Sequence, residues 1–218
     1  MTTKKIGVVG SGAVAQALAG GLAKKGHDVR IGSRDPKKLA DYSAKSGVKT
    51  GTFPEVAAFG DIVILAVKGH VALEAAASIS KEIAGKIVID TSNPVADGPP
   101  VDGSIVPFFT GPNDSLMEQL QKAQPNARFV KSWNCVGAPL MIDPQLEGGR
   151  PTMFICGNDD AAKKEVSAIL AEVGWDAEDI GRASGARAIE PLCQLWCAPG
   201  FLRGDWAHAY RVVRPARK

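Results

Sequence analysis

The sequence has few cysteines, few aromatic residues and no long hydrophobic run. Four cysteines occur in 218 residues, and no two of them form a C-x-x-C pair, so neither a disulfide framework nor a metal site is indicated. No apolar stretch approaches the roughly 18 residues that suggest a membrane span. The chain also starts without the hydrophobic segment of a signal peptide. These absences predict a cytoplasmic protein with free thiols, no metal and no membrane contact.

The charge is small and dispersed along the chain. The sequence has 26 Lys and Arg residues against 23 Asp and Glu residues, a net charge of +3. Basic residues gather only in the tail RVVRPARK, which excludes an extended nucleic-acid footprint and leaves a small anionic ligand as the better match. Hydrophobic residues make up 45% of the chain, as expected for one packed core or one domain with a small appendage.

Strands and helices alternate through the first part of the chain. Short apolar runs predict strands at residues 4–10, 28–33, 60–67, 85–92 and 127–137. Helical patterns occupy residues 13–26, 35–47, 71–85 and 115–125. Strands that are apolar on both faces belong inside a parallel sheet covered by helices. The pattern therefore predicts an α/β fold with a Rossmann-type doubly wound parallel sheet.

The rest of the chain predicts a smaller unit and one long loop. Residues 94–112 are rich in Pro, Gly and Asp, and long ordered loops in compact domains are often functional. After this loop and the last large strand, the pattern predicts elements at residues 151–157, 159–174, 175–181 and 184–202. We therefore expect a first domain at 1–143 and a small C-terminal α/β domain at 144–218.

A glycine-rich turn joins the first strand to the first helix. The run GSGAVA fits G-x-G-x-x-G/A, in which the first glycine allows a tight turn and the second lets a pyrophosphate approach the backbone. The helix N-terminus adds unpaired N–H groups and partial positive charge. The alternative is a purely structural turn. The context of strand, turn and helix favours dinucleotide binding by Gly10, Ser11, Gly12, Ala13 and Val14.

The second strand ends without the acid that is usual in NAD-binding proteins. An Asp or Glu at this point accepts a hydrogen bond from the ribose 2′-OH, whereas this chain has Ser33 and Arg34, with Lys38 one helical turn further on. A hydroxyl, a guanidinium and an ammonium together suit a 2′-phosphate. The sequence therefore predicts NADP(H). The alternative is a solvated basic helix start in which Asp35 replaces the missing acid.

Three later strand ends change abruptly from apolar to small, basic or amide-bearing residues. Ligands of doubly wound sheets lie outside the carboxyl ends of the strands, so these residues are candidates for contact with the ribose and the carboxamide of the cofactor. They are Ala66, Val67, Lys68, Asn93, Pro94, Asn134, Val136 and Gly137. The alternative for the two asparagines is that they only cap local turns.

No acid–base pair is visible in the sequence. Neither Tyr42 nor Tyr210 is followed by Lys four residues later, and no G-x-S-x-G motif occurs. We expect His27 to be solvated, and no catalytic residue is assigned. Carbonyl reduction needs a positioned proton donor, whereas hydride exchange between nicotinamide and a flavin-like ring needs mainly alignment. The second chemistry is favoured. Reduction of a small carbonyl or imine, with Lys68 or water as donor, and a non-catalytic NADPH sensor remain the alternatives.

Several of these segments together resemble a known family. The glycine turn, IGSRDPKK, DTSNP, KSWNCVGA and PTMFICGNDDAAKKEV are similar to the NADPH-dependent reductases of the deazaflavin coenzyme F420 and related dinucleotide-binding reductases. The cytoplasmic domains of six-transmembrane ferric reductases are similar too. One departure is Trp133-Asn134-Cys135, where the family often has Phe-Asn-Thr. A second is the loose match around Leu195-Trp196.

The resemblance implies a cofactor, a co-substrate and roles for the candidate residues. It implies an NADP-binding Rossmann domain, a C-terminal domain with the substrate pocket and dimer contacts, a homodimer, and hydride transfer between nicotinamide C4 and deazaflavin. The pyrophosphate would lie along Ser11, Gly12, Ala13 and Val14. The 2′-phosphate would be held by Ser33, Arg34 and Lys38. The nicotinamide would be bordered by Asn93, Pro94, Asn134, Val136 and Gly137.

Overall fold

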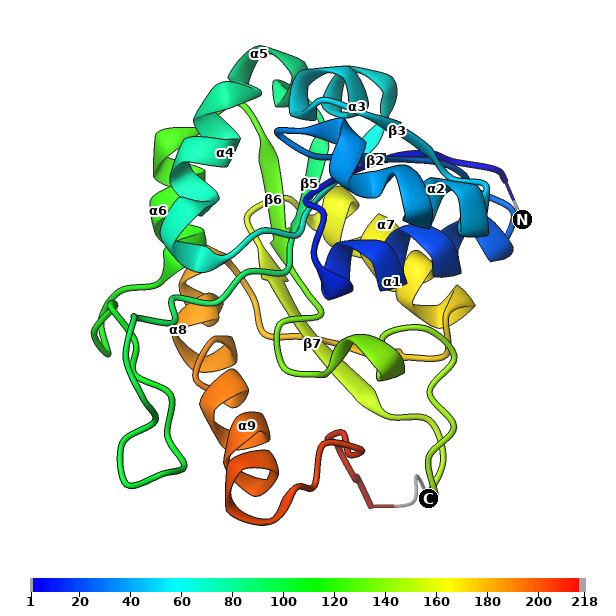
Figure 1. The fold of residues 1–218 in the computed structure, drawn as a ribbon. Coiled ribbons are helices and arrows are strands. Elements are labelled where there is room, and N and C mark those ends of the chain that lie inside the picture. Colours follow the sequence, from blue (N-terminus) through cyan, green and yellow to red (C-terminus); the bar gives the residue numbers. More distant parts are fainter. Residues whose placement is uncertain (1, 216–218) are drawn as a thin grey trace.

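A single sheet organises the part of the chain that the structure describes, residues 2–215 of a computed structural model. Its strand order is β3-β2-β1-β4-β5-β6-β7-β8, with helices packed around it (Figure 1). The strands are β1 (Lys5–Val9), β2 (Asp28–Gly32), β3 (Lys49–Gly51), β4 (Ile62–Leu65), β5 (Ile87–Asp90), β6 (Arg128–Lys131), β7 (Thr152–Gly157) and β8 (Asp176–Asp179). The predicted α/β fold with a Rossmann-type sheet is confirmed.

The pairing of the strands fixes where a ligand can lie. β1 pairs in parallel with β2 on one side and with β4 on the other, so the strand order reverses at β1. The parallel pairing continues from β4 through β5 to β6. Ligands of such sheets bind outside the carboxyl ends of the strands at the point of reversal. The ends of β1, β2, β4, β5 and β6 therefore frame the candidate site.

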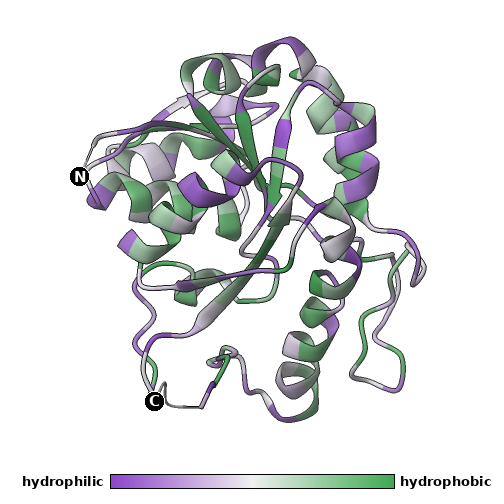
Figure 2. Cartoon of the chain, turned by 180° about the vertical axis from the view of Figure 1, so that it is seen from behind, coloured by the Kyte–Doolittle hydropathy of each residue, from purple (hydrophilic) through white to green (hydrophobic). Residues whose placement is uncertain are grey.

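The central strands bury apolar side chains on both faces. In β4, Ile62 and Ile64 pack into one core, whereas Val63 and Leu65 pack into the other. Figure 2 shows hydrophobic strands enclosed by helices whose outer sides are hydrophilic. One face is covered by α1 (Ala13–Lys24) and α7 (Asp160–Glu172). The other is covered by α3 (Phe53–Phe59), α4 (Ala72–Ser78), α6 (Leu116–Ala123) and α8 (Ala186–Ile189).

Several predicted helices are divided in the structure. The helix predicted at 35–47 consists of a 3₁₀ turn, Pro36–Leu39, followed by α2 (Ala40–Ser46). The helix predicted at 71–85 breaks at Ile79, whose φ is −123°, into α4 and α5 (Ser80–Ile83). The last predicted helix divides at Pro191 into α8 and α9 (Leu192–Arg203). Apolar periodicity alone did not locate these changes of direction.

Residues 48–59 received no assignment from the sequence but form two elements. β3 is an edge strand of three residues, too short to show alternation. α3 begins at a capping box in which the Thr52 side chain accepts from the Glu55 N–H and the Glu55 carboxylate accepts from the Thr52 N–H. The signal T-x-x-E was therefore present in the sequence. α3 packs on both β1 and β2: an added Cβ at Gly7 would lie 2.0 Å from the Val56 carbonyl oxygen, and one at Gly32 would lie 2.6 Å from Val56 Cγ2.

The strand predicted at 127–137 is shorter than expected. β6 ends at Lys131, and Trp133 turns the chain with a φ of +56°. After the 3₁₀ turn Ala138–Leu140, the chain crosses the proposed domain boundary at residue 143 and returns as β7. β7 pairs antiparallel with β6 and parallel with β8. The sheet thus continues past residue 143, and the division into 1–143 and 144–218 stays a prediction.

Three smaller expectations from the sequence concern the cysteines, His27 and membrane-spanning helices. All four cysteines are free. The expectation that His27 is solvated is wrong: its side chain is 1% exposed, Nδ1 accepts from the Lys4 N–H at 3.3 Å, and Nε2 lies 2.9 Å from the Glu172 carboxylate. These partners come from the chain start and from α7, so they were not visible around His27. Among the described residues, no helix is both long and apolar enough to cross a membrane.

Candidate functional site

The glycine turn leaves open space at the start of α1. Gly10 has a φ of +141°, and its N–H donates to the Gly32 carbonyl at 3.1 Å. A Cβ at Gly10 would lie 2.1 Å from the Ala66 carbonyl oxygen, whereas a Cβ at Gly12 would have no atom of the described chain within 4 Å. Gly12 is the exposed N-cap of α1 and offers no side-chain oxygen to the first N–H groups. These groups are therefore available to an anion.

The end of β2 lies beside this turn and is followed by two exposed cations. The Ser33 N–H donates to Gly51 at 3.1 Å, and its Oγ accepts from the Asp35 N–H at 3.2 Å. The Asp35 carboxylate accepts from the Lys37 N–H at 3.2 Å and thereby caps the 3₁₀ turn. Arg34 and Lys38 are exposed and form no ion pair within residues 2–215. This arrangement suits a 2′-phosphate, while Asp35 is occupied as a cap.

The end of β4 closes one side of the same region. The Ala66 N–H donates to the Val9 carbonyl at 2.8 Å, which aligns the ends of β4 and β1. Val67 is half-buried, and Lys68 is exposed at the N-cap of a 3₁₀ turn, Gly69–Val71. Gly69 packs so closely on the Asn93 carbonyl that an added Cβ would lie 1.9 Å from its oxygen. The predicted residues of β4 therefore adjoin those that follow β5.

The two predicted asparagines bind each other. Asn93 Nδ2 donates to the Asn134 carbonyl at 2.7 Å, and Asn134 Nδ2 donates to Asn93 Oδ1 at 3.0 Å. Asn134 Nδ2 also donates to the Ile189 carbonyl at 3.0 Å. Their bonds are thus long-range, and neither side chain serves only a local turn. Asn134 Oδ1 is buried and has no partner in the described chain, so it can accept a hydrogen bond from a ligand.

The remaining predicted residues extend this edge toward the C-terminal segment. Pro94 and Val136 are both buried, and they follow Asn93 by one residue and Asn134 by two residues in the sequence. Gly137 faces the indole of Trp196 in α9, and an added Cβ would lie 2.8 Å from that ring. Trp196 in turn stacks on His208, with ring centroids 5.4 Å apart. The residues predicted to border the nicotinamide therefore adjoin an aromatic segment that belongs to the last part of the chain.

Sequence reasoning missed a buried ionic cluster at the same edge. The Lys131 ammonium lies 2.6 Å from Asp90 Oδ2 and 2.8 Å from Glu190 Oε1, and none of the three side chains is more than 2% exposed. Burial lowers the pKa of Lys131, but the two carboxylates outweigh it and raise the pKa overall. The available signal was the presence of an Asp and a Lys at the ends of the apolar runs IVID and FVK.

Two thiols of this region, Cys135 and Cys193, and the phenol of Tyr210 have raised pKa values, whereas the pKa of the Cys197 thiol is lowered. Burial raises the pKa of Cys135 to about 12, and burial also raises the pKa of Tyr210 to about 12. In α9, a hydrogen bond between Cys193 and Cys197 raises the pKa of Cys193 and lowers that of Cys197. Cys135 and Tyr210 are therefore poor proton donors near neutral pH.

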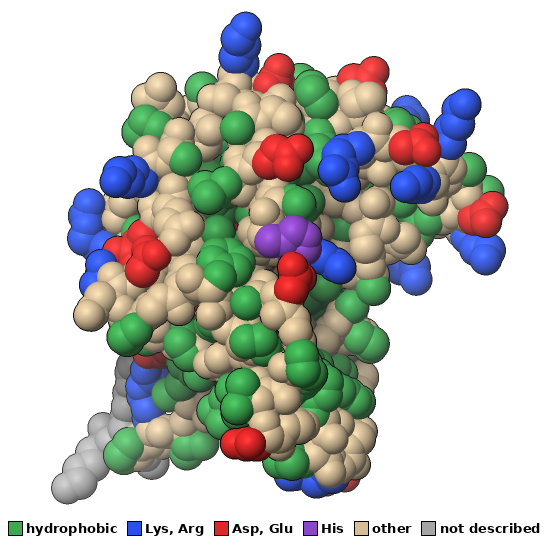
Figure 3. All heavy atoms as spheres, turned by 60° about the vertical axis from the view of Figure 1, so that its left-hand side comes forward, with side chains coloured by type: hydrophobic (Ala, Val, Ile, Leu, Met, Phe, Trp, Pro, Cys, Tyr) green, Lys and Arg blue, Asp and Glu red, His purple; other side chains and the backbone are tan. Residues whose placement is uncertain are grey.

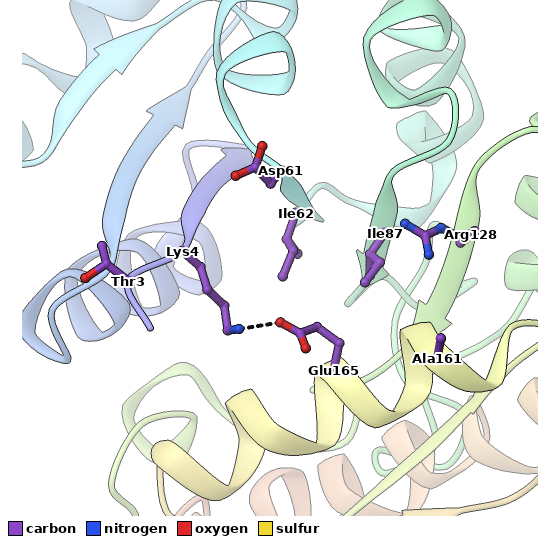
Figure 4. Close-up of a pocket in the computed structure, with 8 residues that line it drawn as sticks. All are labelled: Thr3, Lys4, Asp61, Ile62, Ile87, Arg128, Ala161 and Glu165. Atoms are coloured by element: carbon purple, nitrogen blue, oxygen red, sulfur yellow. Dashed lines mark hydrogen bonds and ion pairs between the residues drawn. The ribbon is translucent and has the colours of Figure 1, made fainter. Parts of the chain in front are cut away.

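A separate cleft lies at the opposite edge of the sheet. Its volume is about 400 Å³, and the ion pair between Lys4 and Glu165 spans it (Figure 4). The lining residues are Thr3, Lys4, Asp61, Ile62, Ile87, Arg128, Ala161 and Glu165. The strand residues among them lie at or just before the amino ends of β1, β4, β5 and β6. None of the predicted cofactor residues lines this cleft, so its location does not match the carboxyl-edge site.

Comparison with known proteins gives the family. Residues 5–94 match the family described as "NADP oxidoreductase coenzyme F420-dependent". The F420-dependent NADP reductase of Methanothermobacter thermautotrophicus is 29% identical over 207 residues, which cover 88% of this chain and 87% of that protein. A solved structure from Arthrobacter sp. FB24, provisionally named an F420-dependent NADP reductase, is 35% identical with a TM-score of 0.89, covering 97% of this chain and 100% of that one.

A further relative matches over only part of its length. The rat metalloreductase STEAP3 is 30% identical over 212 residues, but this chain spans 39% of its length. In fold and sequence the chain is thus similar to NADP-dependent oxidoreductases. The chain belongs to the family of coenzyme F420-dependent NADP oxidoreductases.

Proposed function

We propose that the protein transfers a hydride between C4 of the NADP(H) nicotinamide and the deazaflavin ring of coenzyme F420. The observation that carries the proposal is the continuous carboxyl edge of the sheet. It joins an open glycine turn, the exposed cations Arg34 and Lys38, which form no ion pair within the described residues, and the linked side chains of Asn93 and Asn134. The similarity to F420-dependent NADP reductases over most of their length supports deazaflavin as the co-substrate.

The residues of this edge match the successive parts of an NADP molecule. We place the pyrophosphate at the N-terminus of α1, the 2′-phosphate at the end of β2, and the nicotinamide beyond β5 and β6. The proposed contacts are Gly10, Ser11, Gly12, Ala13 and Val14, then Ser33, Arg34 and Lys38, then Ala66, Val67, Lys68, Asn93, Pro94, Asn134, Val136 and Gly137. Asn134 Oδ1, which lacks a partner within the described chain, would accept from the nicotinamide carboxamide.

The protonation of the site favours hydride transfer over carbonyl reduction. Bound NADPH would supply the hydride at nicotinamide C4. A carbonyl substrate would also need a proton donor whose pKa lies near the working pH. Burial raises the pKa of both Cys135 and Tyr210 to about 12, and all three N–H groups of the Lys131 ammonium are taken up by protein oxygens. These residues therefore align the reactants and do not relay a proton.

The acceptor would lie against the C-terminal segment, and a second copy of the chain would cover part of it. Exposed apolar side chains occur on α9, on the turn after it and on the 94–112 loop, and hydrophobic side chains gather among other atoms in the lower part of Figure 3. The exposed side chains are Val101, Ile105, Phe109, Leu195, Phe201, Leu202 and Trp206. Exposed apolar patches often mark protein interfaces. We propose a homodimer through these side chains, which sedimentation equilibrium would test.

Steady-state NADPH oxidation tests the function. The acceptors would be F420, FMN, FAD, simple carbonyls and a cyclic imine, with NADH as the control donor. Turnover with NADPH and F420 alone would support the proposal. Turnover with a carbonyl or imine and none with F420 would show that the hydride acceptor is a small organic substrate and not deazaflavin. Tight NADPH binding without any turnover would leave an NADPH sensor.

A further inference from the structure

The buried ion triad formed by Asp90, Lys131 and Glu190 has no direct access to a ligand. The exposed fractions of the three residues are 0%, 0% and 1%. The Lys131 ammonium contacts Asp90 Oδ2 at 2.6 Å, the Ser92 carbonyl at 2.8 Å and Glu190 Oε1 at 2.8 Å. An ammonium has three N–H donors, so none remains for substrate. Any role of the triad in the reaction must act through the residues that it holds.

The triad joins the two halves of the proposed site. Asp90 ends β5, three residues before Asn93, and Lys131 ends β6, three residues before Asn134. Glu190 follows α8 and leads through one proline into α9, the acceptor side. The Glu190 carboxylate also accepts from the N–H groups at residues 116 and 117, both at 3.0 Å, at the start of α6. One carboxylate thus fixes α8 and α6 to the cofactor-bearing strands.

A second contact follows the same path. Asn134 Nδ2, on the nicotinamide side, donates at 3.0 Å to the carbonyl of Ile189, the residue before Glu190. The Asp90 carboxylate in turn accepts from both the N–H (2.9 Å) and the Oγ (2.5 Å) of Ser92, the residue before Asn93. The asparagine pair is therefore anchored to the triad from both of its strands.

We propose that the buried ion triad is a positioning unit, which sets the spacing between the nicotinamide and an acceptor held against α8 and α9. This inference rests on the proposed function. Buried ion clusters are often no more stabilising than apolar residues of the same volume, so stability alone does not account for the triad. Hydride transfer, by contrast, needs reacting atoms about 3–3.5 Å apart, and a shift of about 1 Å can cost roughly 100-fold in rate.

The test variant is Glu190→Gln, which keeps the shape of the side chain and removes one negative charge. The matched control is Glu118→Gln. Glu118 also joins α6 to α8, through two 2.8 Å bonds to Arg187, but this pair is exposed. Three quantities are measured in each variant: the Kd for 2′,5′-ADP, which lacks nicotinamide; the fluorescence of bound NADPH; and the single-turnover rate of hydride transfer to F420.

In Glu190→Gln we expect a Kd for 2′,5′-ADP within about twofold of wild type, an altered fluorescence of bound NADPH, and hydride transfer slowed by about tenfold or more. In Glu118→Gln all three stay within about twofold. Wild-type transfer by Glu190→Gln would overturn the inference. An equal loss in Glu118→Gln would overturn it too, since any link between α6 and α8 would then suffice.

The experiment also distinguishes a folding failure of Glu190→Gln from a failure of the proposed function. If Glu190→Gln does not fold, the variant combining Asp90→Asn, Lys131→Met and Glu190→Gln leaves no buried charge unpaired. This triple variant is expected to fold and to show the same loss of rate, and a wild-type rate would overturn the inference. If the wild-type protein reduces no acceptor, the proposed function fails. Altered fluorescence of NADPH bound to Glu190→Gln would then still support the positioning role, and unaltered fluorescence would overturn it.

Discussion

Asn93 and Asn134, which are 41 residues apart in the sequence, exchange two hydrogen bonds at the carboxyl edge of the sheet, one of 2.7 Å and one of 3.0 Å. Each asparagine follows a different parallel strand, β5 or β6. Their contact brings the two strand ends together directly beneath the place proposed for the nicotinamide. In the proposed function, the orientation of the cofactor would therefore depend on a pair that neither segment forms alone.

Asn134→Asp tests this pair. A carboxylate cannot donate to Asn93 Oδ1 or to the Ile189 carbonyl, so we expect the free energy of unfolding to fall by about 2–3 kcal/mol or more. Asn158→Asp is the control, because Asn158 is exposed and uses only its oxygen, which accepts from the Ala183 N–H at 3.1 Å. It should change stability by about 0.5 kcal/mol or less. Equal urea midpoints for the two variants would contradict the assigned bonds.

Substitutions at Gly10 and Gly12 should impair different properties, namely thermal stability at Gly10 and nucleotide binding at Gly12. Gly12→Val places a side chain where the described chain leaves at least 4 Å free. We expect a Tm within a few degrees of wild type together with loss of NADPH and NADH binding. Gly10→Ala forces a Cβ to 2.1 Å from the Ala66 carbonyl oxygen at a φ of +141°. It should lower the Tm strongly. Unchanged NADPH binding by Gly12→Val would refute the pyrophosphate placement.

Arg34→Ala should distinguish the two cofactors. Loss of a charge-assisted hydrogen bond to the 2′-phosphate costs about 1.5–3 kcal/mol, so the Kd for NADPH should rise by about one to two orders of magnitude. The Kd for NADH should change little. Lys45→Ala, which removes an exposed cation in the last turn of α2, is the control for general charge. Isothermal titration calorimetry measures the Kd for NADPH and the Kd for NADH in both variants and in the wild type. An equal loss of affinity for both nucleotides in Arg34→Ala would exclude the 2′-phosphate assignment.

Stability should decline in mildly alkaline solution. Burial raises the pKa of Cys135 from 9.0 to about 12, and burial likewise raises the pKa of Cys156 from 9.0 to about 12. The folded state thus holds protons that the unfolded state releases above pH 9. The free energy of unfolding should therefore fall by about 1.4 kcal/mol per pH unit for each thiol.

Urea titrations between pH 9 and 10 measure this slope. Cys135→Ala and Cys156→Ala should each reduce it by one thiol's share, whatever their effect on stability at pH 7. Val166→Ala is the control, because Val166 is also fully buried but has no titratable group, so it can lower stability without changing the slope. A slope that does not change in either of the first two variants would show that neither buried thiol carries the alkaline loss.

Local sequence determined a large part of the fold. The apolar runs that became β1, β4 and β5 are nearly continuous, so each had to be buried on both faces, and the helices between the strands make the parallel crossovers. The cap at Asp35 is a local feature too, because its carboxylate accepts from the Lys37 N–H two residues further on. Short or bent elements were missed because β3 has only three residues and Ile79 breaks a helix without a Pro or Gly.

The candidate site likewise has one part that local sequence indicated and another part that only the tertiary structure brings together. The glycine turn and Ser33, Arg34 and Lys38 were legible because each lies within one strand, turn and helix unit, whose geometry local residues dictate. What only the tertiary structure decided is the meeting of distant segments: Asn93 with Asn134, His27 with Glu172, and Lys131 with Asp90 and Glu190. Parallel strands that are neighbours in the sheet are far apart in sequence, so their side chains become partners only when the sheet has formed.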